Sequence, residues 1–302
     1  MSVALAGDDL LGRGLQRIQQ EVDAAFDSLL PVPDDARAGL VQAMRHACIG
    51  GGKRVRPLLL VTVAEMYGCS RAEAIRAACA IEAIHAYSLV HDDLPCMDDD
   101  ALRHGKPAVH VAFGEAVAVL AGDALHAFAF ELIADAETSA EPSVRAELVQ
   151  CLALASGYNG MAGGQMMDIV ADGALFDLPT VIRLQELKTG ALLCAAVEMG
   201  AILGGVPSER RGHLRAYARD IGLAFQIADD LLDHEGDEEL AGKALRKDAE
   251  QGKATFVGLL GAEKTREQAR MLSDRAIDQL AGWGEEADLL RALARFVVER
   301  DR

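Results

Sequence analysis

Apolar residues recur at spacings of three and four along nearly the whole chain, which is the period of one face of an α-helix. Glycine and proline residues interrupt this pattern and divide it into separate elements. The pattern predicts helices at residues 10–29, 35–48, 54–67, 71–93, 109–136, 143–157, 180–203, 208–233, 250–260, 263–281 and 285–300. No stretch alternates clearly enough to predict a strand. Composition does not shift along the chain and no short-period repeat stands out, so we expect residues 1–302 to form one all-α domain, a helical bundle.

The most apolar segment runs from Thr189 to Ser208, with Glu198 as its one charged residue. It contains several glycines and a proline and lies between polar helices. We therefore interpret it as a buried core helix and expect no membrane span. The amino-terminal sequence MSVALAGDDLLGRGL lacks the basic start and the long apolar run of a signal peptide.

Composition narrows the class of protein. Hydrophobic residues make up 51% of the 302 residues and aromatic residues only 4%, and a chain rich in Ala, Leu and Val favours helices over a sandwich or barrel. The net charge of −17 leaves no basic stripe to neutralise phosphates, so we expect no nucleic-acid partner. Scattered cysteines without a CxxC pair are typical of reduced thiols in a cytoplasmic protein, the location that we expect. They are Cys48, Cys69, Cys79, Cys96, Cys151 and Cys194.

Two aspartate clusters carry the most chemical information: DDLPCMD at residues 92–98 and DDLLD at residues 229–233. Each follows a long apolar, helix-patterned stretch, which places several carboxylates at the edge of a hydrophobic cavity. Crowded carboxylates repel one another and lose hydration there, at a cost of roughly several kcal/mol that a bound cation removes. Oxygen ligands in this number suit Mg²⁺, which keeps waters and shares its other positions with substrate phosphates. Two such clusters facing one cavity would bind a diphosphate through several metal ions.

The spacing within each cluster is compatible with a metal site, although an exposed acidic turn is the alternative for both. Asp229 and Asp233 are four residues apart, so on a helix they are offset by about 40° and share a face. Asp92 and Asp98 are six apart and would not align on a regular helix. Because Pro95 ends or kinks the helix between them, we expect a turn to bring Asp98 back toward the helix end.

A glycine-rich turn carries cations into a predicted helix, in the sequence GGGKRVRP at residues 50–57. Lys53 and Arg56 are three apart and share a face close to free backbone N–H groups, which is the arrangement of an anion site. The alternative is an ordinary helix start with solvated bases. Lys188 interrupts an apolar helix, where a lone lysine needs an anionic partner, and Arg103 follows the first acidic cluster.

The most polar interior segment is HEGDEELAGKALRKDAEQGK at residues 234–253, which contains Lys243 and Lys253. It would suit a mobile loop over the mouth of a site. His85 stands six residues before His91 on the helix that leads into the first cluster, and by itself such a histidine is usually a core residue. The chain has no nucleophile elbow, no HExxH motif and no Rossmann glycine pattern.

Taken together, these motifs resemble the trans-prenyltransferases, specifically the short-chain isoprenyl diphosphate synthases of bacterial farnesyl diphosphate synthase type. The resemblance implies an all-α bundle around a deep central cavity, a homodimer, and Mg²⁺, expected as three ions per site, bridging protein and diphosphate. It runs through GGKRVRP, EAIHAYSLVHDDLPCMDDDALRHGKPAVH, FGEAVAVLAGDAL, GGQMMDI, LKTGALL, FQIADDLLD and GKATF.

The same resemblance implies roles for particular residues. The expected metal ligands are Asp92, Asp98, Asp229 and Asp233. The other residues expected to take part in catalysis are Asp93, Asp230, Arg103 and Lys188. Isopentenyl diphosphate is expected at Lys53, Arg56 and His85. The allylic diphosphate is expected at Arg103, Lys188, Thr189, Gln226, Lys243 and Lys253.

One position departs from the family pattern. The family usually has two arginines after the first motif, the second of which contacts isopentenyl diphosphate, and here that position is His104. A histidine with a pKa near 6.5 is a weaker and pH-dependent anion ligand. Because a bound diphosphate raises the histidine pKa, we expect weakened affinity rather than lost binding.

The implied reaction joins isopentenyl diphosphate to dimethylallyl or geranyl diphosphate and releases pyrophosphate. By resemblance, Tyr87 and Ser88 line the start of the elongation tunnel, and a tyrosine there would stop growth near fifteen carbons. Farnesyl diphosphate is therefore the expected product, and geranylgeranyl diphosphate is the alternative. A terpene cyclase would carry an Asn/Ser/Glu triad in place of DDLLD. A non-catalytic subunit of a heteromeric synthase generally loses one acidic motif, and this chain has both.

Overall fold

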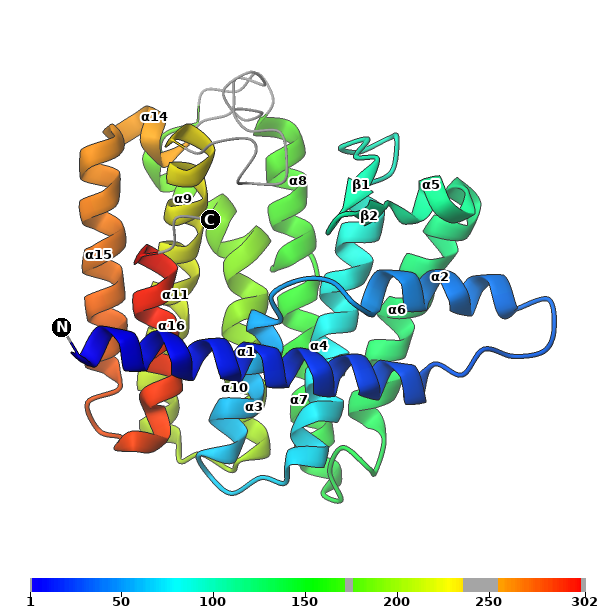
Figure 1. Cartoon of the computed structure of the whole chain (residues 1–302), viewed down its shortest axis with the longest axis horizontal. Helices are drawn as coiled ribbons and strands as arrows, with labels where there is room; N and C mark the ends of the chain where they lie inside the picture. Colours follow the sequence, from blue (N-terminus) through cyan, green and yellow to red (C-terminus); the bar gives the residue numbers. More distant parts are fainter. Residues whose placement is uncertain (1, 172–175, 236–254, 300–302) are drawn as a thin grey trace. The chain divides into compact units, whose positions relative to one another are not determined.

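A computed structural model describes residues 2–171, 176–235 and 255–299, and within these ranges the chain is almost entirely helical (Figure 1). The all-α class predicted from the apolar spacing is therefore confirmed. Contacts between residues divide the chain into two compact units. The N-terminal unit comprises residues 12–150 and 202–204, and the C-terminal unit comprises residues 1–11, 151–201 and 205–302. A single domain over the whole chain stays a prediction.

The N-terminal unit is built around α4, which contacts α2, α3 and α6 and is buried on nearly every side. Its many alanines let the neighbouring helices approach closely, and Gly122 of α6 is the tightest such place. A Cβ atom at Gly122 would overlap the ring of His91, whose Nε2 lies 3.1 Å from the Val119 carbonyl oxygen. The elements of this unit are α1 (Ser2–Leu29) from Gly12 onward, α2 (Ala38–Cys48), α3 (Val55–Glu65), α4 (Arg71–Asp92), β1 (Leu102–Arg103), β2 (Lys106–Pro107), α5 (Val109–Phe113), α6 (Glu115–Ala134) and α7 (Pro142–Ser156) up to Gln150.

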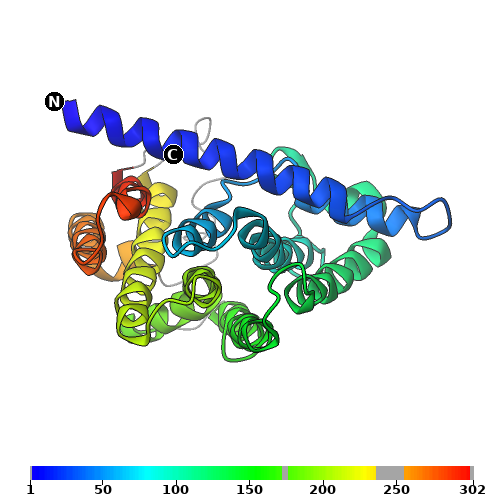
Figure 2. The same cartoon turned by 90° about the horizontal axis from the view of Figure 1, so that it is seen from below.

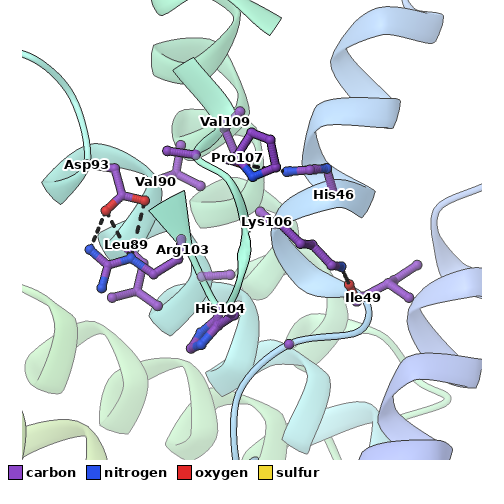
Figure 3. A pocket seen from close by; sticks show the side chains of 14 residues that line it. His46, Ile49, Leu89, Val90, Asp93, Arg103, His104, Lys106, Pro107 and Val109 are labelled. Atoms are coloured by element: carbon purple, nitrogen blue, oxygen red, sulfur yellow. Dashed lines mark hydrogen bonds and ion pairs between the residues drawn. The ribbon is translucent and has the colours of Figure 1, made fainter. Parts of the chain in front are cut away.

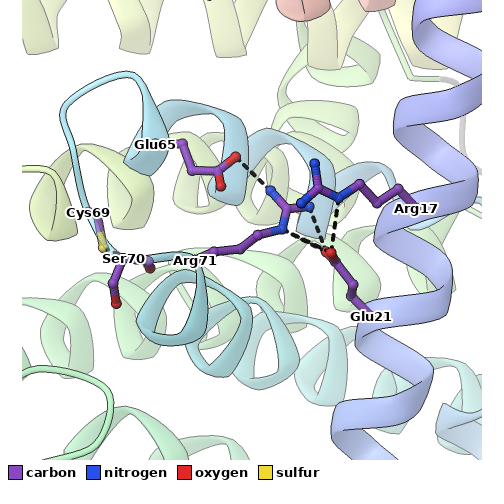
Figure 4. A network of polar contacts seen from close by, with 6 residues as sticks. All are labelled: Arg17, Glu21, Glu65, Cys69, Ser70 and Arg71. Atoms are coloured by element: carbon purple, nitrogen blue, oxygen red, sulfur yellow. Dashed lines mark hydrogen bonds and ion pairs between the residues drawn. The ribbon is translucent and has the colours of Figure 1, made fainter.

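A cap and a charge network fix the start of α4. The Ser70 hydroxyl is the N-cap: it accepts a hydrogen bond from the Glu73 amide (3.3 Å) and donates one to the Glu73 carboxylate (2.6 Å). Beside this cap, Arg71 forms ion pairs with Glu21 of α1 at 2.6 Å and with Glu65 of α3 at 2.7 Å (Figure 4). One arginine thus joins three helices, although such part-exposed pairs contribute only about 0–1 kcal/mol each.

A hairpin follows the first acidic cluster, where the sequence predicted no strand. Its strands β1 and β2 have two residues each and pair antiparallel, with Arg103 opposite Lys106. The turn residues His104 and Gly105 both have positive φ (53° and 74°), as a type I′ turn requires. Strands of two residues cannot display an alternating apolar pattern, so they cannot be predicted from it.

The C-terminal unit is built along α11, which contacts both α15 and α16; the three helices lie together in both views (Figures 1 and 2). Tyr217 of α11 is fully buried, and its hydroxyl donates a hydrogen bond to the Leu290 carbonyl of α16 (2.8 Å). The elements of this unit are α8 (Met161–Ala171), α9 (Leu178–Gln185), the π-helical turn η1 (Glu186–Gly190), α10 (Ala191–Leu203) up to Ala201, α11 (Ser208–Glu235), α14 (Phe256–Leu260), α15 (Ala262–Gln279), the 3₁₀ turn η2 (Glu285–Ala287) and α16 (Asp288–Glu299).

Several predicted helices differ from the structure. The predicted helix 109–136 is divided at Gly114, whose φ of 88° separates α5 from α6. The predicted helix 180–203 contains the π-helical turn η1. Helix α8 was not predicted at all, because the adjacent glycines 163 and 164 lower helix propensity and obscure the apolar spacing.

Among the described residues, α6 is the one helix whose length and apolar composition would allow it to cross a membrane, a test that a core helix also passes. The segment from Thr189 to Ser208 is not one helix, because it is divided among η1, α10 and the turn before α11. Most of α10 is buried, including Leu192, Val197 and Met199, so the interpretation of that segment as part of the core is confirmed.

Candidate functional site

The first acidic motif lies where α4 ends. The helix stops at Asp92, and the Asp98 amide donates a hydrogen bond to the Asp92 carbonyl (2.8 Å). The Asp99 amide, at positive φ, bonds the Leu94 carbonyl (3.2 Å) inside the same turn. The predicted return of Asp98 to the helix end at Pro95 is therefore confirmed. Asp98 is exposed and Asp92 is half-buried, which leaves carboxylates at the surface of this unit.

Asp93 differs from its neighbours because it is buried, with 2% of its surface exposed. Arg103 of β1 donates from Nε to Asp93 (3.0 Å) and pairs with it through a second nitrogen (Figure 3). The same guanidinium lies 3.3 Å from the Asp100 carboxylate. Burial disfavours the charge on Arg103, but the bonds to Asp93 outweigh it and raise the Arg103 pKa. Asp93 thus fixes the hairpin to the acidic turn.

The glycine-rich turn is shaped by a residue that the sequence did not single out. Arg54 is buried and adopts a left-handed backbone conformation with φ of 52°. Its guanidinium pairs with Glu82 of α4 and with Asp23 of α1, both at 2.7 Å, and also donates to the Cys48 carbonyl. Asp23 in turn accepts a hydrogen bond from the Gly50 amide (3.1 Å). These two partners could not be found from the sequence, because Asp23 lies 31 residues and Glu82 lies 28 residues from Arg54.

Arg56, His85 and His104 form a cluster of basic groups in the same unit. The Arg56 Nε atom is buried and has no hydrogen-bond partner among the described residues. Burial lowers the Arg56 pKa, and the effect of Glu82 offsets this only in part. Burial also lowers the His85 pKa well below its usual value, and Arg56 and His104 lower it further. Positive charge that is desolvated and incompletely paired favours an anionic ligand at this place.

His104 lies against the glycine-rich turn. A Cβ atom on Gly51 would come within 3.0 Å of the His104 ring, and one on Gly52 within 3.5 Å. His104 is exposed as a residue, but partial loss of hydration and the charges of Arg103 and Arg54 lower its pKa. The predicted isopentenyl diphosphate residues Arg56, His85 and His104 are therefore brought together, and Lys53 is exposed on the same turn.

A small cavity lies behind the hairpin, between α2 and α4 (Figure 3). Two bonds close it on the side of α2. Lys106 donates from Nζ to the Ile49 carbonyl (2.7 Å), and the His46 Nε2 atom lies 2.8 Å from the Pro107 carbonyl oxygen. The hairpin that carries Arg103 is therefore anchored to the end of α2 as well as to α4.

The second acidic motif lies near the end of α11 in the C-terminal unit. Asp229 and Asp233 are half-buried and, four residues apart on this helix, share a face as predicted. Asp230 is buried instead, with 6% of its surface exposed. It accepts hydrogen bonds from the Gln226 amide group (3.3 Å) and from the Phe256 backbone amide (2.9 Å). Like Asp93, Asp230 is therefore hydrogen-bonded to other groups of the protein.

The π-helical turn η1 carries Lys188 and Thr189. The Lys188 ammonium pairs with Asp168 of α8 at 2.6 Å, which is the anionic partner that its apolar setting requires. The Thr189 hydroxyl donates to the Gln226 side-chain oxygen (3.2 Å). Lys188, Thr189, Gln226 and the second acidic motif are therefore gathered in one unit. The predicted ligands Lys243 and Lys253 lie outside the described residues.

The expected metal ligands are all carboxylates, Asp92 and Asp98 in the first motif and Asp229 and Asp233 in the second. Within the described ranges, no three His, Cys, Asp or Glu side chains are gathered into a ready-made metal cage. Mg²⁺ does not need one, because it keeps several waters and binds through one or two carboxylates together with substrate phosphates. Asp92 with Asp98, and Asp229 with Asp233, each supply such a pair, so the donor set fits Mg²⁺ bound together with a diphosphate.

The two proposed chain-length residues lie on α4 just before the first motif. Tyr87 is half-buried, and burial together with the charge of Asp92 raises its pKa. Its ring contacts those of His91 and His126 edge-on, with centroid distances of 5.8 and 5.1 Å. The Ser88 hydroxyl donates to the His85 carbonyl within the helix (2.8 Å).

The chain is similar in sequence and in fold to known prenyl diphosphate synthases. The family model described as Polyprenyl synthetase matches residues 37–288. The farnesyl diphosphate synthase of Escherichia coli strain K12 is 42% identical over 293 residues, or 94% of this chain and 97% of that protein. The chloroplastic geranylgeranyl pyrophosphate synthase of Catharanthus roseus is 46% identical over 266 residues, or 86% of this chain and 73% of that protein. The apo crystal structure of an FPP/GFPP synthase from Zymomonas mobilis has 52% identity and a TM-score of 0.88, covering 95% of this chain and 98% of that one.

The pairing of Arg54 with Glu82 predicts a measurable difference between buried and exposed ion pairs. Replacing Glu82 by Gln keeps the shape but removes a charge that faces a buried arginine, so the free energy of unfolding should fall by about 2–4 kcal/mol. Glu65→Gln removes a more exposed partner of Arg71 and should cost about 0–1 kcal/mol. Denaturant unfolding of both variants measures the difference, and equal losses would contradict the assigned role of Glu82.

Proposed function

This chain belongs to the polyprenyl synthetase family, and from that premise we propose that it is a Mg²⁺-dependent trans-prenyltransferase that makes farnesyl diphosphate. Its substrates would be isopentenyl diphosphate and the allylic dimethylallyl and geranyl diphosphates. The observation that carries the proposal is the basic cluster at the glycine-rich turn, where the desolvated Arg56 has a buried nitrogen without a partner among the described residues. A diphosphate supplies the negative charge that this cluster lacks.

Isopentenyl diphosphate would bind at Lys53, Arg56, His85 and His104. The hydrogen bonds of Arg54 hold the turn in place, so the binding groups need little reorganisation when the ligand arrives. The neutral His85 would donate a hydrogen bond, or would take up a proton as the diphosphate raises its pKa.

The allylic diphosphate would bind at Arg103, Lys188, Thr189 and Gln226, with Lys243 and Lys253 as further ligands. Mg²⁺ held by Asp92, Asp98, Asp229 and Asp233, in three ions per site, would supply Lewis-acid stabilisation of the charge on the departing pyrophosphate. Asp93 and Asp230 would act indirectly, because their contacts position Arg103 and the start of α14.

The chemistry would proceed by ionisation, condensation and elimination. The carbon–oxygen bond of the allylic substrate breaks, and its electron pair leaves with pyrophosphate. The double bond of isopentenyl diphosphate attacks the allylic cation and forms the new carbon–carbon bond. The resulting cation loses a proton to the pyrophosphate, so no protein base is required. The role of the protein would be to bind both diphosphates, orient them and exclude water.

Product length is the finer part of the proposal. Tyr87 is held between two other rings, which supports a fixed obstacle on α4 and hence a product of fifteen carbons. Geranylgeranyl diphosphate is the alternative product. The observation that supports this alternative is the 46% identity to a geranylgeranyl pyrophosphate synthase.

We further propose that the protein acts as a homodimer in the cytoplasm, with no nucleic-acid partner. The exposed face of α6 includes Val119 and Leu120, which are 42% and 55% exposed, and a second copy of the chain would cover such apolar side chains. A monomeric mass in sedimentation equilibrium would contradict the dimer.

An assay with dimethylallyl and isopentenyl diphosphates, followed by chromatography of the products, tests the activity. We expect prenyl products that depend on added Mg²⁺. Asp92→Ala or Asp229→Ala should reduce turnover by about two or more orders of magnitude, because charge stabilisation of the leaving group is lost. Cys96→Ala is the matched control within the first motif and should leave turnover unchanged. Full activity of the Asp92→Ala protein would refute the assignment.

Substitution of His104 by Arg should lower the KM for isopentenyl diphosphate by roughly tenfold, which corresponds to about 1.4 kcal/mol. The cause is that arginine is charged at every pH tested, whereas the lowered pKa of His104 keeps the ring neutral near pH 7 in the free protein. As the pH falls toward the lowered pKa of His104, the wild-type histidine gains charge and the two KM values should converge. KM measured from pH 5.5 to 8 tests this, and an identical KM throughout would show that position 104 does not contact the substrate.

Tyr87→Ala should lengthen the product mixture beyond fifteen carbons, because it removes a half-buried ring just before the first motif. Tyr87→Phe retains the ring and serves as the control, so its products should match those of the wild-type protein. Product chromatography distinguishes these outcomes, and an unchanged length with alanine would place the obstacle at another residue.

A further inference from the structure

The π-helical turn η1 is packed between two glycines from different helices. Gly164 of α8 approaches it from one side and Gly222 of α11 from the other. A π-helical turn is a rare, locally strained element that is found frequently at functional sites. We therefore expect contacts with neighbouring helices to stabilise this turn.

The contact at Gly164 is made directly to the backbone of Lys188. A Cβ atom at Gly164 would overlap the Lys188 amide nitrogen and lie 2.5 Å from its Cα and 2.7 Å from the Leu187 carbonyl carbon. No side-chain rotation relieves such an overlap, because every neighbouring atom belongs to the main chain. Any larger residue at 164 must therefore displace Lys188.

The contact at Gly222 is looser but acts on the same turn. A Cβ atom there would lie 3.3 Å from the Gly190 Cα and 3.7 Å from the Leu193 side chain. Such a contact yields after a shift of a few tenths of an ångström. The two glycines should therefore differ in importance, with Gly164 the more sensitive.

Each glycine is followed, four residues later on the same helix, by the polar partner of an η1 side chain. Asp168 follows Gly164 and pairs with Lys188, while Gln226 follows Gly222 and accepts the hydrogen bond of Thr189. Residues four apart lie on one helical face, so each helix presents a close backbone contact and a polar contact to the same turn.

We infer that Gly164 and Gly222 are positioning residues that hold the π-helical turn from two sides and thereby set the places of Lys188 and Thr189 for an anionic ligand. The inference deepens the proposed function, since it names what fixes two of the allylic diphosphate ligands. A displacement of about 1 Å at such ligands can cost roughly a hundredfold in rate.

The first test is Gly164→Ala, with KM measured separately for the two substrates. We expect the KM for the allylic diphosphate to rise roughly tenfold or more, while the KM for isopentenyl diphosphate changes less than about twofold. Binding of inorganic pyrophosphate with Mg²⁺, measured by calorimetry, should weaken in parallel. The binding arm still tests the inference if the wild-type chain makes no prenyl product, an outcome that would refute the proposed function alone.

Two control variants separate positioning from loss of stability. A Cβ atom at Gly163 would overlap the Tyr158 carbonyl oxygen, and its three nearest atoms all belong to Tyr158, so Gly163→Ala should lower the melting temperature without the selective rise in allylic KM. Gly212 of α11 has open space around it, and Gly212→Ala should change neither quantity. If Gly164→Ala does not fold, Gly222→Ala decides, with an expected rise of roughly twofold to fivefold.

A double-mutant cycle with Lys188→Ala tests whether Gly164 acts through Lys188. In the Lys188→Ala background, adding Gly164→Ala should raise the allylic KM less than about twofold, because the displaced ammonium is already absent. Fully additive effects, or equal rises in both KM values for Gly164→Ala, would overturn the inference.

Discussion

The burial of the Arg54 guanidinium between Glu82 and Asp23 is the interaction on which the glycine-rich turn of the N-terminal unit depends. A left-handed backbone conformation costs a residue with a side chain about 1–2 kcal/mol, and Arg54 retains it because three acceptors hold the far end of the side chain. Arg54 is thus buried within the protein, whereas Lys53 beside it is exposed and Arg56 is half-buried. Under the proposed function, one short motif therefore contains both a residue that stabilises the fold and residues that bind the diphosphate.

Each of the two acidic motifs likewise combines a buried aspartate with a less buried one. In the first motif the buried Asp93 holds Arg103, and in the second the buried Asp230 holds the Phe256 amide and Gln226. The neighbouring Asp92 and Asp229 are half-buried instead. Each doubled aspartate thus combines one buried carboxylate that anchors protein groups with one that is more accessible, and the proposed function assigns the more accessible one to Mg²⁺.

The sequence predicted most of what depends on local chemistry. The apolar spacing located the long helices, and Pro95 correctly indicated the turn that returns Asp98 to Asp92. It could not reveal Glu82 as the partner of Arg54, because that contact is made only by tertiary packing. The π-helical turn escaped prediction for a related reason, since Gly164 and Gly222 approach it from other helices. Helix α8 was missed because its glycines, which weaken local helix preference, serve the packing of its neighbours.

The position of His104 at the tip of a tight hairpin has an evolutionary consequence. The residue belongs to no helix and packs chiefly on the backbone of the glycine-rich turn, so exchanging it disturbs little of the hydrophobic core. The charge presented to the basic cluster can therefore vary among descendants of this chain while the helices around it stay as they are. Under the proposed function, a single substitution at position 104 would change the charge that meets the substrate without a compensating change in the helices.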